Sequence, residues 1–168
     1  AIIGAVILLY TRRTFPLTPL AYTLILLHCW ILMVGGHYTY AEVPLFDWLR
    51  DALEQSRNNY DKLGHFAQGF VPAIICREII IRKKWMQPAW VIQFFTVCFC
   101  LAFSAFYELI EWLVAELSGS DAVAFLGTQG YVWDTQSDMA FALFGAITAL
   151  LVLSHLHNQQ ILLLENKV

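Results

Sequence analysis

Long apolar segments separated by short polar ones are the feature that most constrains how this chain can fold. A helix of about 20 apolar residues, rising 1.5 Å per residue, crosses the roughly 30 Å hydrocarbon core of a bilayer. Of the 168 residues, 59% are hydrophobic and 14% are charged, whereas soluble domains carry about 25% charged residues. A soluble protein this apolar could not cover its surface, so we predict an integral membrane protein with a single domain, residues 1–168.

The segments predict an all-α fold, a polytopic transmembrane helical bundle with four complete spans and a truncated N-terminal one. Residues 1–10 are apolar but cover only about half of the hydrocarbon core. No initiator Met or basic residue precedes them, so we interpret them as the end of a helix, not as a signal peptide. A short interfacial helix is expected within residues 46–53, and residues 157–168 carry no motif. The complete spans are expected at about 19–36, 61–82, 89–117 and 134–156.

Basic residues predict the orientation of the bundle, because Lys and Arg in short loops favour the cytoplasmic side. Across the alternating spans, seven basic residues lie on one side, and only Arg50, Arg57 and Lys62 lie on the other. We therefore expect a multi-pass protein with a cytoplasmic C-terminus, in which Arg77 and Glu78 extend to the cytoplasmic interface. The net charge of −3 gives no basic field for nucleic acid, and membrane lipids are the expected partners.

Polar residues gather at the outer ends of the predicted spans. Asp61, His65 and Gln68 stand at i, i+4 and i+7, so they share one face of a helix. Glu108 and Glu111 stand at i and i+3 near the outer end of the 89–117 span. Glutamates this close to lipid are costly, and they should face protein or water. We therefore expect four helices to direct their polar groups toward one outer cavity.

This pattern favours a polar site that suits a divalent metal. Carboxylates from two helices together with histidines are ligands that Zn²⁺, Mn²⁺ and Fe²⁺ accept. His65 and Glu108 are the expected catalytic residues, each as a general base or a ligand. The expected metal ligands are His37, Asp61, His65, Glu108, Glu111 and Asp138. The residues expected to contact a substrate are Gln68, Tyr107 and Gln129.

Several of these polar residues also have a structural interpretation. Asp61 lies in a first helical turn, where a carboxylate favours the helix dipole. Asp134 can serve as an N-cap. Glu108 and Glu111 can pair with basic residues of the neighbouring outer loop, and His37 can belong to an interfacial aromatic belt.

Four motifs, in this order along the chain, resemble the YjdF family of bacterial inner-membrane proteins. They are Gly35-Gly36-His37-Tyr38-Thr39-Tyr40, the Asp61–His65–Gln68–Gly69 motif, Tyr107-Glu108-Leu109-Ile110-Glu111-Trp112, and Gly127-Thr128-Gln129-Gly130 followed by Asp134 and Asp138. The similarity covers nearly the whole chain. It implies a bacterial inner-membrane location, a further N-terminal segment and no established biochemical function.

The segment that begins at Asp61 is also similar to the DKxxHF opening of VanZ-like membrane proteins, which are linked with glycopeptide resistance at the cell envelope. This chain lacks the Asn that those proteins carry after the aspartate of the last helix, since Asp138 is followed by Met-Ala-Phe-Ala. The similarity implies an envelope context.

Three classes of function are compatible with the sequence, and it leaves open whether the protein is an enzyme. The leading hypothesis is a periplasm-facing site for an envelope lipid or a lipid-linked substrate. A proton-coupled transporter would need an aqueous path to the cytoplasmic side, where polar residues become sparse. A structural or regulatory partner protein would instead use its outer loops as binding surfaces.

Overall fold

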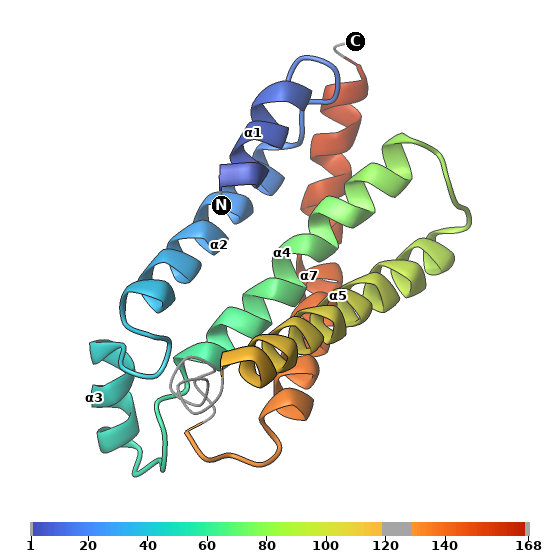
Figure 1. Ribbon diagram of the computed structural model, residues 1–168. Helices are drawn as coiled ribbons and strands as arrows, with labels where there is room; N and C mark the ends of the chain where they lie inside the picture. The colour runs from blue at the N-terminus through green and yellow to red at the C-terminus, as the bar shows by residue number, and fades with distance from the viewer. Residues whose placement is uncertain (1, 119–128, 167–168) are drawn as a thin grey trace.

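The computed structural model describes residues 2–118 and 129–166, and helices make up most of them. The long helices α2, α4, α5 and α7 form the bundle; α3 lies at one end of it, and α1 lies at the other end near the end of α7 (Figure 1). The helices are α1 Ile2–Thr11, α2 Pro19–His37, α3 Pro44–Ala52, α4 Tyr60–Arg82, α5 Ala89–Ser118 and α7 Asp134–Glu165. The predicted all-helical class is confirmed, and the short helix expected within 46–53 is α3.

Three helices, α2, α5 and α7, are long and apolar enough to cross a membrane. Helix α4 has 23 residues, about 34 Å at helical rise, but it carries charges at both ends. Asp61 and Lys62 lie in its first turn, and Arg77, Glu78 and Arg82 lie in its last two turns. Three candidate spans are therefore established, while four complete spans and a truncated one remain a prediction.

Helix α4 is the centre of the bundle. It packs against α2, α5 and α7, and most extensively against α7. The α4–α7 crossing is so close that a Cβ on Gly69 would lie 1.7 Å from the carbonyl oxygen of Ala142. A Cβ on Gly145 would in turn lie 2.1 Å from the carbonyl oxygen of Phe66. Small residues permit such close approach of helix backbones in membranes, and this contact lies one turn below His65 and Asp138.

A buried polar network closes the end of the bundle opposite to α3, and Glu78 is its centre. One Glu78 oxygen accepts from the Thr18 backbone N–H at 2.9 Å and from Arg82 at 2.9 Å. The other accepts from the Thr18 hydroxyl at 2.7 Å and faces His157 Nε2 at 3.1 Å. Arg77 donates to His157 Nδ1 at 3.1 Å. Since a guanidinium can only donate, His157 is neutral and its Nε2 carries the proton that Glu78 accepts.

This network corrects two predictions. Arg77 and Glu78 do not extend to the protein surface, because Glu78 is fully buried and Arg77 is 6% exposed. The last helix does not end at 156, because α7 continues to Glu165. The segment 157–168 therefore contributes His157 and Asn158, both of which bind Arg77. A lone charge cannot be buried in this way, but a paired and hydrogen-bonded set can.

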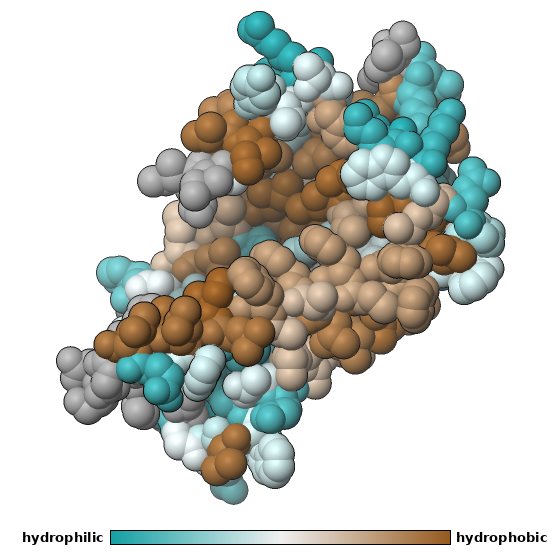
Figure 2. Space-filling model, turned by 45° about the vertical axis from the view of Figure 1, so that its right-hand side comes forward, coloured by the Kyte–Doolittle hydropathy of each residue, from teal (hydrophilic) through white to brown (hydrophobic). Residues whose placement is uncertain are grey.

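The exterior of the bundle is apolar. Figure 2 shows hydrophobic surface across the middle of the visible face, with hydrophilic residues gathered toward the two ends. Helix α5 contributes much of the exposed apolar surface, including Trp90, Phe94 and Phe106, each about 60% exposed or more. In water this surface would be unfavourable, whereas in a bilayer it contacts lipid chains.

Candidate functional site

The site lies at the α3 end of the bundle, where Asn58 fixes the chain that enters α4. The Asn58 side chain donates to the Val43 carbonyl at 3.1 Å and to Asp47 at 3.0 Å. Its backbone N–H donates to Gln129 Oε1 at 3.1 Å, and its carbonyl accepts from Gln129 Nε2 at 2.9 Å. Asn58 is fully buried. These bonds connect α3, the start of α4 and the segment before α7.

Five charged side chains form a buried ion network above the α4–α7 crossing. Arg57 donates to Asp134 and to Asp61 at 2.6 Å each. The Lys62 ammonium donates to Asp138 at 2.6 Å and to Asp134 at 2.9 Å, and lies 3.7 Å from Asp61. The carboxylates of Asp61, Asp134 and Asp138 are close enough together to hold a metal ion. In this structure the Lys62 ammonium and the Arg57 guanidinium provide the positive charge among them.

The Arg57 guanidinium remains charged in this buried setting. Burial alone lowers its pKa, but the hydrogen bond to Asp134 and the nearby charge of Asp61 outweigh that effect, so the pKa of Arg57 is raised. Its positive charge is therefore a fixed part of the network.

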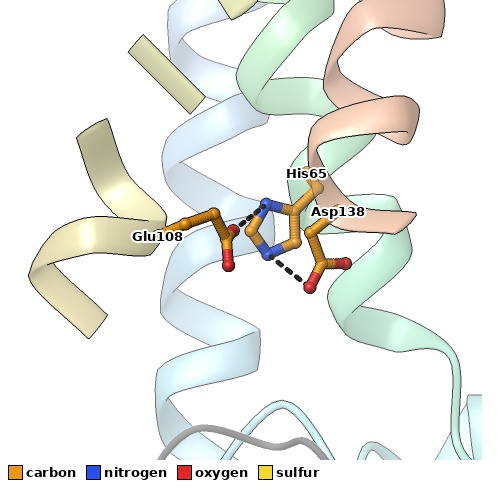
Figure 3. Close-up of side chains that lie close together, drawn as sticks. All are labelled: His65, Glu108 and Asp138. Carbon is orange, nitrogen blue, oxygen red and sulfur yellow. Dashed lines mark ion pairs between the residues drawn. The ribbon is translucent and has the colours of Figure 1, made fainter. Parts of the chain in front are cut away.

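The second cluster consists of His65, Glu108 and Asp138, which come from α4, α5 and α7. The His65 ring lies between the two carboxylates (Figure 3), with Nδ1 3.7 Å from Glu108 Oε1 and Nε2 3.7 Å from Asp138 Oδ2. Both separations are too long for hydrogen bonds. Asp138 connects the two clusters, because its other oxygen accepts from Lys62.

Two polar atoms of this second cluster are buried without a hydrogen-bond partner. They are His65 Nδ1 and Glu108 Oε1, which face each other, and Ser104 Oγ is a third such atom one turn below Glu108. Buried polar groups are normally satisfied, so each exception requires an explanation. The three ligand atoms of His65, Glu108 and Asp138 lie within 4.8 Å of one another. The arrangement therefore has room and unused bonding capacity for a small cation or a water molecule.

The buried charges at this end do not balance. Among the described residues, four buried carboxylates (Asp61, Glu108, Asp134 and Asp138) face two fixed cations, Arg57 and Lys62. With His65 neutral and all four carboxylates ionised, the site carries two excess negative charges. Protons or a divalent cation would remove this excess, because uncompensated buried charge is strongly unfavourable.

A cavity of about 460 Å³ opens beside His65 between α2, α4 and α5. Its polar lining includes Asp61, His65, Gln68 and Glu111, and its apolar lining comes mainly from α2 and α5. Pro72 has no backbone N–H, so the helix supplies no donor to the carbonyl of Gln68. The cavity combines carboxylate, imidazole and amide side chains with apolar walls, the form of a site for an amphiphilic ligand.

The family model described as "Predicted membrane protein (DUF2238)" matches residues 1–159. The chain belongs to this family. It is 53% identical over 160 residues to "Inner membrane protein YjdF" of Escherichia coli (strain K12), a match that covers 95% of this chain and 77% of the relative. No solved structure matches the chain. The resemblance predicted from the motifs is confirmed, and this DUF2238 protein is a membrane protein whose homologue resides in the inner membrane.

The structure of this DUF2238 member brings most of the predicted site residues together. His65, Glu108 and Asp138 converge, Asp61 lies in the adjacent ion network, and Gln68 and Glu111 line the cavity. Tyr107 also lines the cavity, with its ring edge-on to His65 at 6.3 Å between centroids.

Two residues predicted to belong to the site, His37 and Gln129, lie outside the His65–Glu108–Asp138 cluster and the cavity lining. His37 is exposed at the end of α2 and contacts the ring of Tyr38, and it belongs to neither group of potential metal ligands among the described residues. Gln129 uses its amide to clamp the backbone of Asn58. Thr128, named beside it in the sequence motif, lies outside the described residues.

Asp61 does lie in the first turn of α4, whereas the structural interpretation of Asp134 is corrected. Asp134 is not the N-cap of α7, since Trp133 holds that position without a side-chain hydrogen bond, and the Asp134 carboxylate binds Arg57 and Lys62 instead. These two cations are engaged by the aspartates, and Glu108 faces only His65 among the described ion pairs.

Sequence reasoning missed Tyr40, which forms part of the cavity wall. Its φ of 58° folds the side chain back over Gly35, and its hydroxyl donates to the Leu32 carbonyl at 3.2 Å. Burial and then the neighbouring Tyr107, Tyr60 and Glu111 raise the pKa of Tyr40 to about 12, so the phenol keeps its proton. The paired glycines before it were the available signal, because a Cβ on Gly35 would collide with the Tyr40 ring.

Proposed function

We propose that this protein holds a divalent metal ion between His65, Glu108 and Asp138 and uses it on the head group of an envelope lipid or a lipid-linked substrate. The observation that carries the proposal is the pair of unpartnered buried atoms, His65 Nδ1 and Glu108 Oε1, which face each other across 3.7 Å. A metal ion between them would supply the missing interactions and offset the excess negative charge.

The donor set favours a transition metal. One imidazole nitrogen and two carboxylate oxygens suit Zn²⁺, Mn²⁺ or Fe²⁺, with bonds of about 2.0–2.2 Å. Ligand atoms that lie within 4.8 Å of one another would need to move only slightly to reach such an ion. Three protein ligands leave a coordination position for water or substrate, as in catalytic metal sites.

The supports for a lipid substrate are the membrane location and the adjoining cavity. The cavity has polar groups from Asp61, Gln68 and Glu111 at one side and apolar side chains such as Leu32 and Ile110 at the other. A head group would lie against the polar side and Tyr107, while hydrocarbon would contact the apolar walls.

The proposed orientation places this site on the periplasmic side and the C-terminus in the cytoplasm. Arg12 and Arg13 directly follow α1, and Lys83 and Lys84 directly follow the end of α4 opposite to the site. Such residues favour the cytoplasm. Arg57 and Lys62, the basic residues beside the site, are neutralised by aspartates.

Metal content of the purified protein tests the proposal. After loading with Zn²⁺, Mn²⁺ or Fe²⁺ and removal of the excess, inductively coupled plasma mass spectrometry should find about one ion per wild-type chain. His65→Gln and Glu108→Gln should each weaken binding at least tenfold. Glu116→Gln is the matched control, because Glu116 is exposed two turns further along α5. Equal metal content in all four proteins, or none in the wild type, would contradict the proposal.

One observation favours a second candidate, proton-coupled transport. The two ring nitrogens of His65 face two different carboxylates at 3.7 Å each, so the ring could pass a proton between Glu108 and Asp138 without a metal. In vesicles containing a pH-sensitive dye, an imposed proton gradient would then collapse faster with the wild type than with His65→Gln. Equal rates together with bound metal would leave the metal site as the better account.

A further inference from the structure

A second hollow lies between α4 and α5 on the far side of Phe103 from the site cavity. It measures about 470 Å³ and is lined by apolar side chains, among them Ile75, Ile79, Trp85 and Phe99. Its described lining contains no charged residue. From Pro72 to Ile80 it follows α4 over nine residues, a rise of about 12 Å.

The two hollows share one residue, Phe103, whose side chain lines both of them. Phe103 is 43% exposed, so its ring lies at the surface between α4 and α5. One hollow leads from this ring to the polar groups around His65. The other leads away from the ring to Trp85 at the α4–α5 turn. A molecule with a polar head and a hydrocarbon chain matches this order of surfaces along the α4–α5 groove.

We infer that this apolar hollow holds one hydrocarbon chain of the lipid whose head group binds at the His65–Glu108 cavity. The inference rests on the proposed function for the identity of the head-group site, and it adds where the chain of the substrate lies. An apolar cavity does not stabilise water. An empty one would forfeit dispersion contacts along its lining, and the surrounding bilayer supplies hydrocarbon to fill it.

Pro72 supports the placement of the chain. It lies inside α4 and also lines the hollow. A proline ring within a helix removes one backbone hydrogen bond and crowds the preceding turn. Pro72 therefore places a helix-bending residue at the wall of the hollow, beside the proposed hydrocarbon chain.

Native mass spectrometry of the full chain provides the test. Protein would be taken from vesicles of phosphatidylethanolamine and phosphatidylglycerol, mixed 3:1, and the lipid that stays bound would be counted at rising collision energy. The wild type should retain about one lipid per chain. Ile79→Trp, which fills the hollow, should lower this retention at least tenfold. Leu151→Trp is the matched control, since Leu151 is 80% exposed on α7 and should retain lipid as the wild type does.

A second variant keeps the test decisive if Ile79→Trp folds poorly. Phe99→Ala enlarges the hollow, because the Phe99 ring lines it, and should shift the retained lipid toward longer chains in a mixed-chain vesicle. Unchanged retention in Ile79→Trp together with an unchanged chain distribution in Phe99→Ala would overturn the inference. A lipid-free dimer that Ile79→Trp separates would also overturn it, because the hollow would then be an interface between copies.

The two proposals fail separately in these experiments. Lipid that is retained by the wild type and lost from Ile79→Trp supports the chain site even where no metal binds. Metal binding by a wild type that retains no lipid would support the metal site and remove the chain site.

Discussion

The close crossing of α4 and α7 gives the sharpest prediction about how the site is held together. Gly69→Ala adds one methyl group at a place where it would lie 1.7 Å from the Ala142 oxygen, 2.6 Å from its carbonyl carbon and 2.9 Å from its Cα. An ordinary contact for such a carbon is at least 3.4 Å. The obstructing atoms belong to the backbone, so no side chain can rotate away. To bring the 1.7 Å contact to an ordinary distance, the two helices must move apart by about the same amount again.

This separation has a stability cost and a functional one. Overpacking typically costs about 1–3 kcal/mol, and we expect the upper end because rigid helices must move. At roughly 2–4 °C per kcal/mol for a chain of this size, the melting temperature should fall by about 6–12 °C. His65 and Asp138 each lie one turn above the crossing, so their 3.7 Å separation would widen and metal affinity should fall at least tenfold.

Thermal unfolding in detergent with a thiol-reactive fluorogenic dye measures the first effect, because Cys100 is fully buried and free. Gly36→Ala is the matched control, since a Cβ there meets nothing within 4 Å, and alanine is the better helix former. A Gly69→Ala variant that melts within 2 °C of the wild type by this scale and binds metal normally would refute the reasoning.

Three further substitutions have defined outcomes. Lys62→Met removes a cation that lies 2.6 Å from Asp138, so calorimetry should show metal affinity raised at least tenfold. In the metal-free protein the same change should lower the free energy of unfolding by about 3 kcal/mol. Unchanged metal affinity would show that Lys62 does not influence the site. Glu78→Gln removes the negative charge that Arg82 and His157 contact. It should lower the free energy of unfolding by about 3 kcal/mol and leave metal binding unchanged. Loss of metal binding would contradict a purely structural role for Glu78. Asn58→Ala deletes three side-chain hydrogen bonds and should cost about 2–3 kcal/mol, read as a lower melting temperature; a melting temperature equal to that of the wild type would be the contrary result.

Periodicity and composition were sufficient to predict the helices, because most of them are mainly apolar segments between polar or proline-containing turns. Residue 61 as the start of the central helix and residue 89 as the start of the next were predicted within one residue. The end of α7 was not predicted, since the sequence after 156 becomes more polar and resembles an unstructured C-terminal tail. His157 is fully buried there because Arg77 and Glu78 come from another helix, and a single sequence does not reveal that partner.

For the site, the sequence indicated which residues would meet but not how they would pair. Shared depth in the bundle predicted that His65, Glu108 and Asp138 would converge, and they do. The pairing of Arg57 and Lys62 with aspartates depends on how α4 and α7 are rotated about their axes. That rotation is set by the Gly69 and Gly145 contact, a backbone feature that polarity patterns do not encode.

The contrast between the two sides of the site has a mechanical consequence. His65 and Asp138 belong to helices whose backbones touch, whereas Glu108 belongs to α5, which is joined to α4 by a short turn and keeps most of its surface outside the bundle. His65 and Asp138 are thus held in fixed relative positions, whereas Glu108 lies on a helix that is less firmly packed. If α5 swings about that turn, Glu108 advances or retreats while the other two groups stay in place. The same movement would widen or narrow the entrance beside Tyr107, so that admission of a ligand and assembly of the proposed metal site would be a single motion.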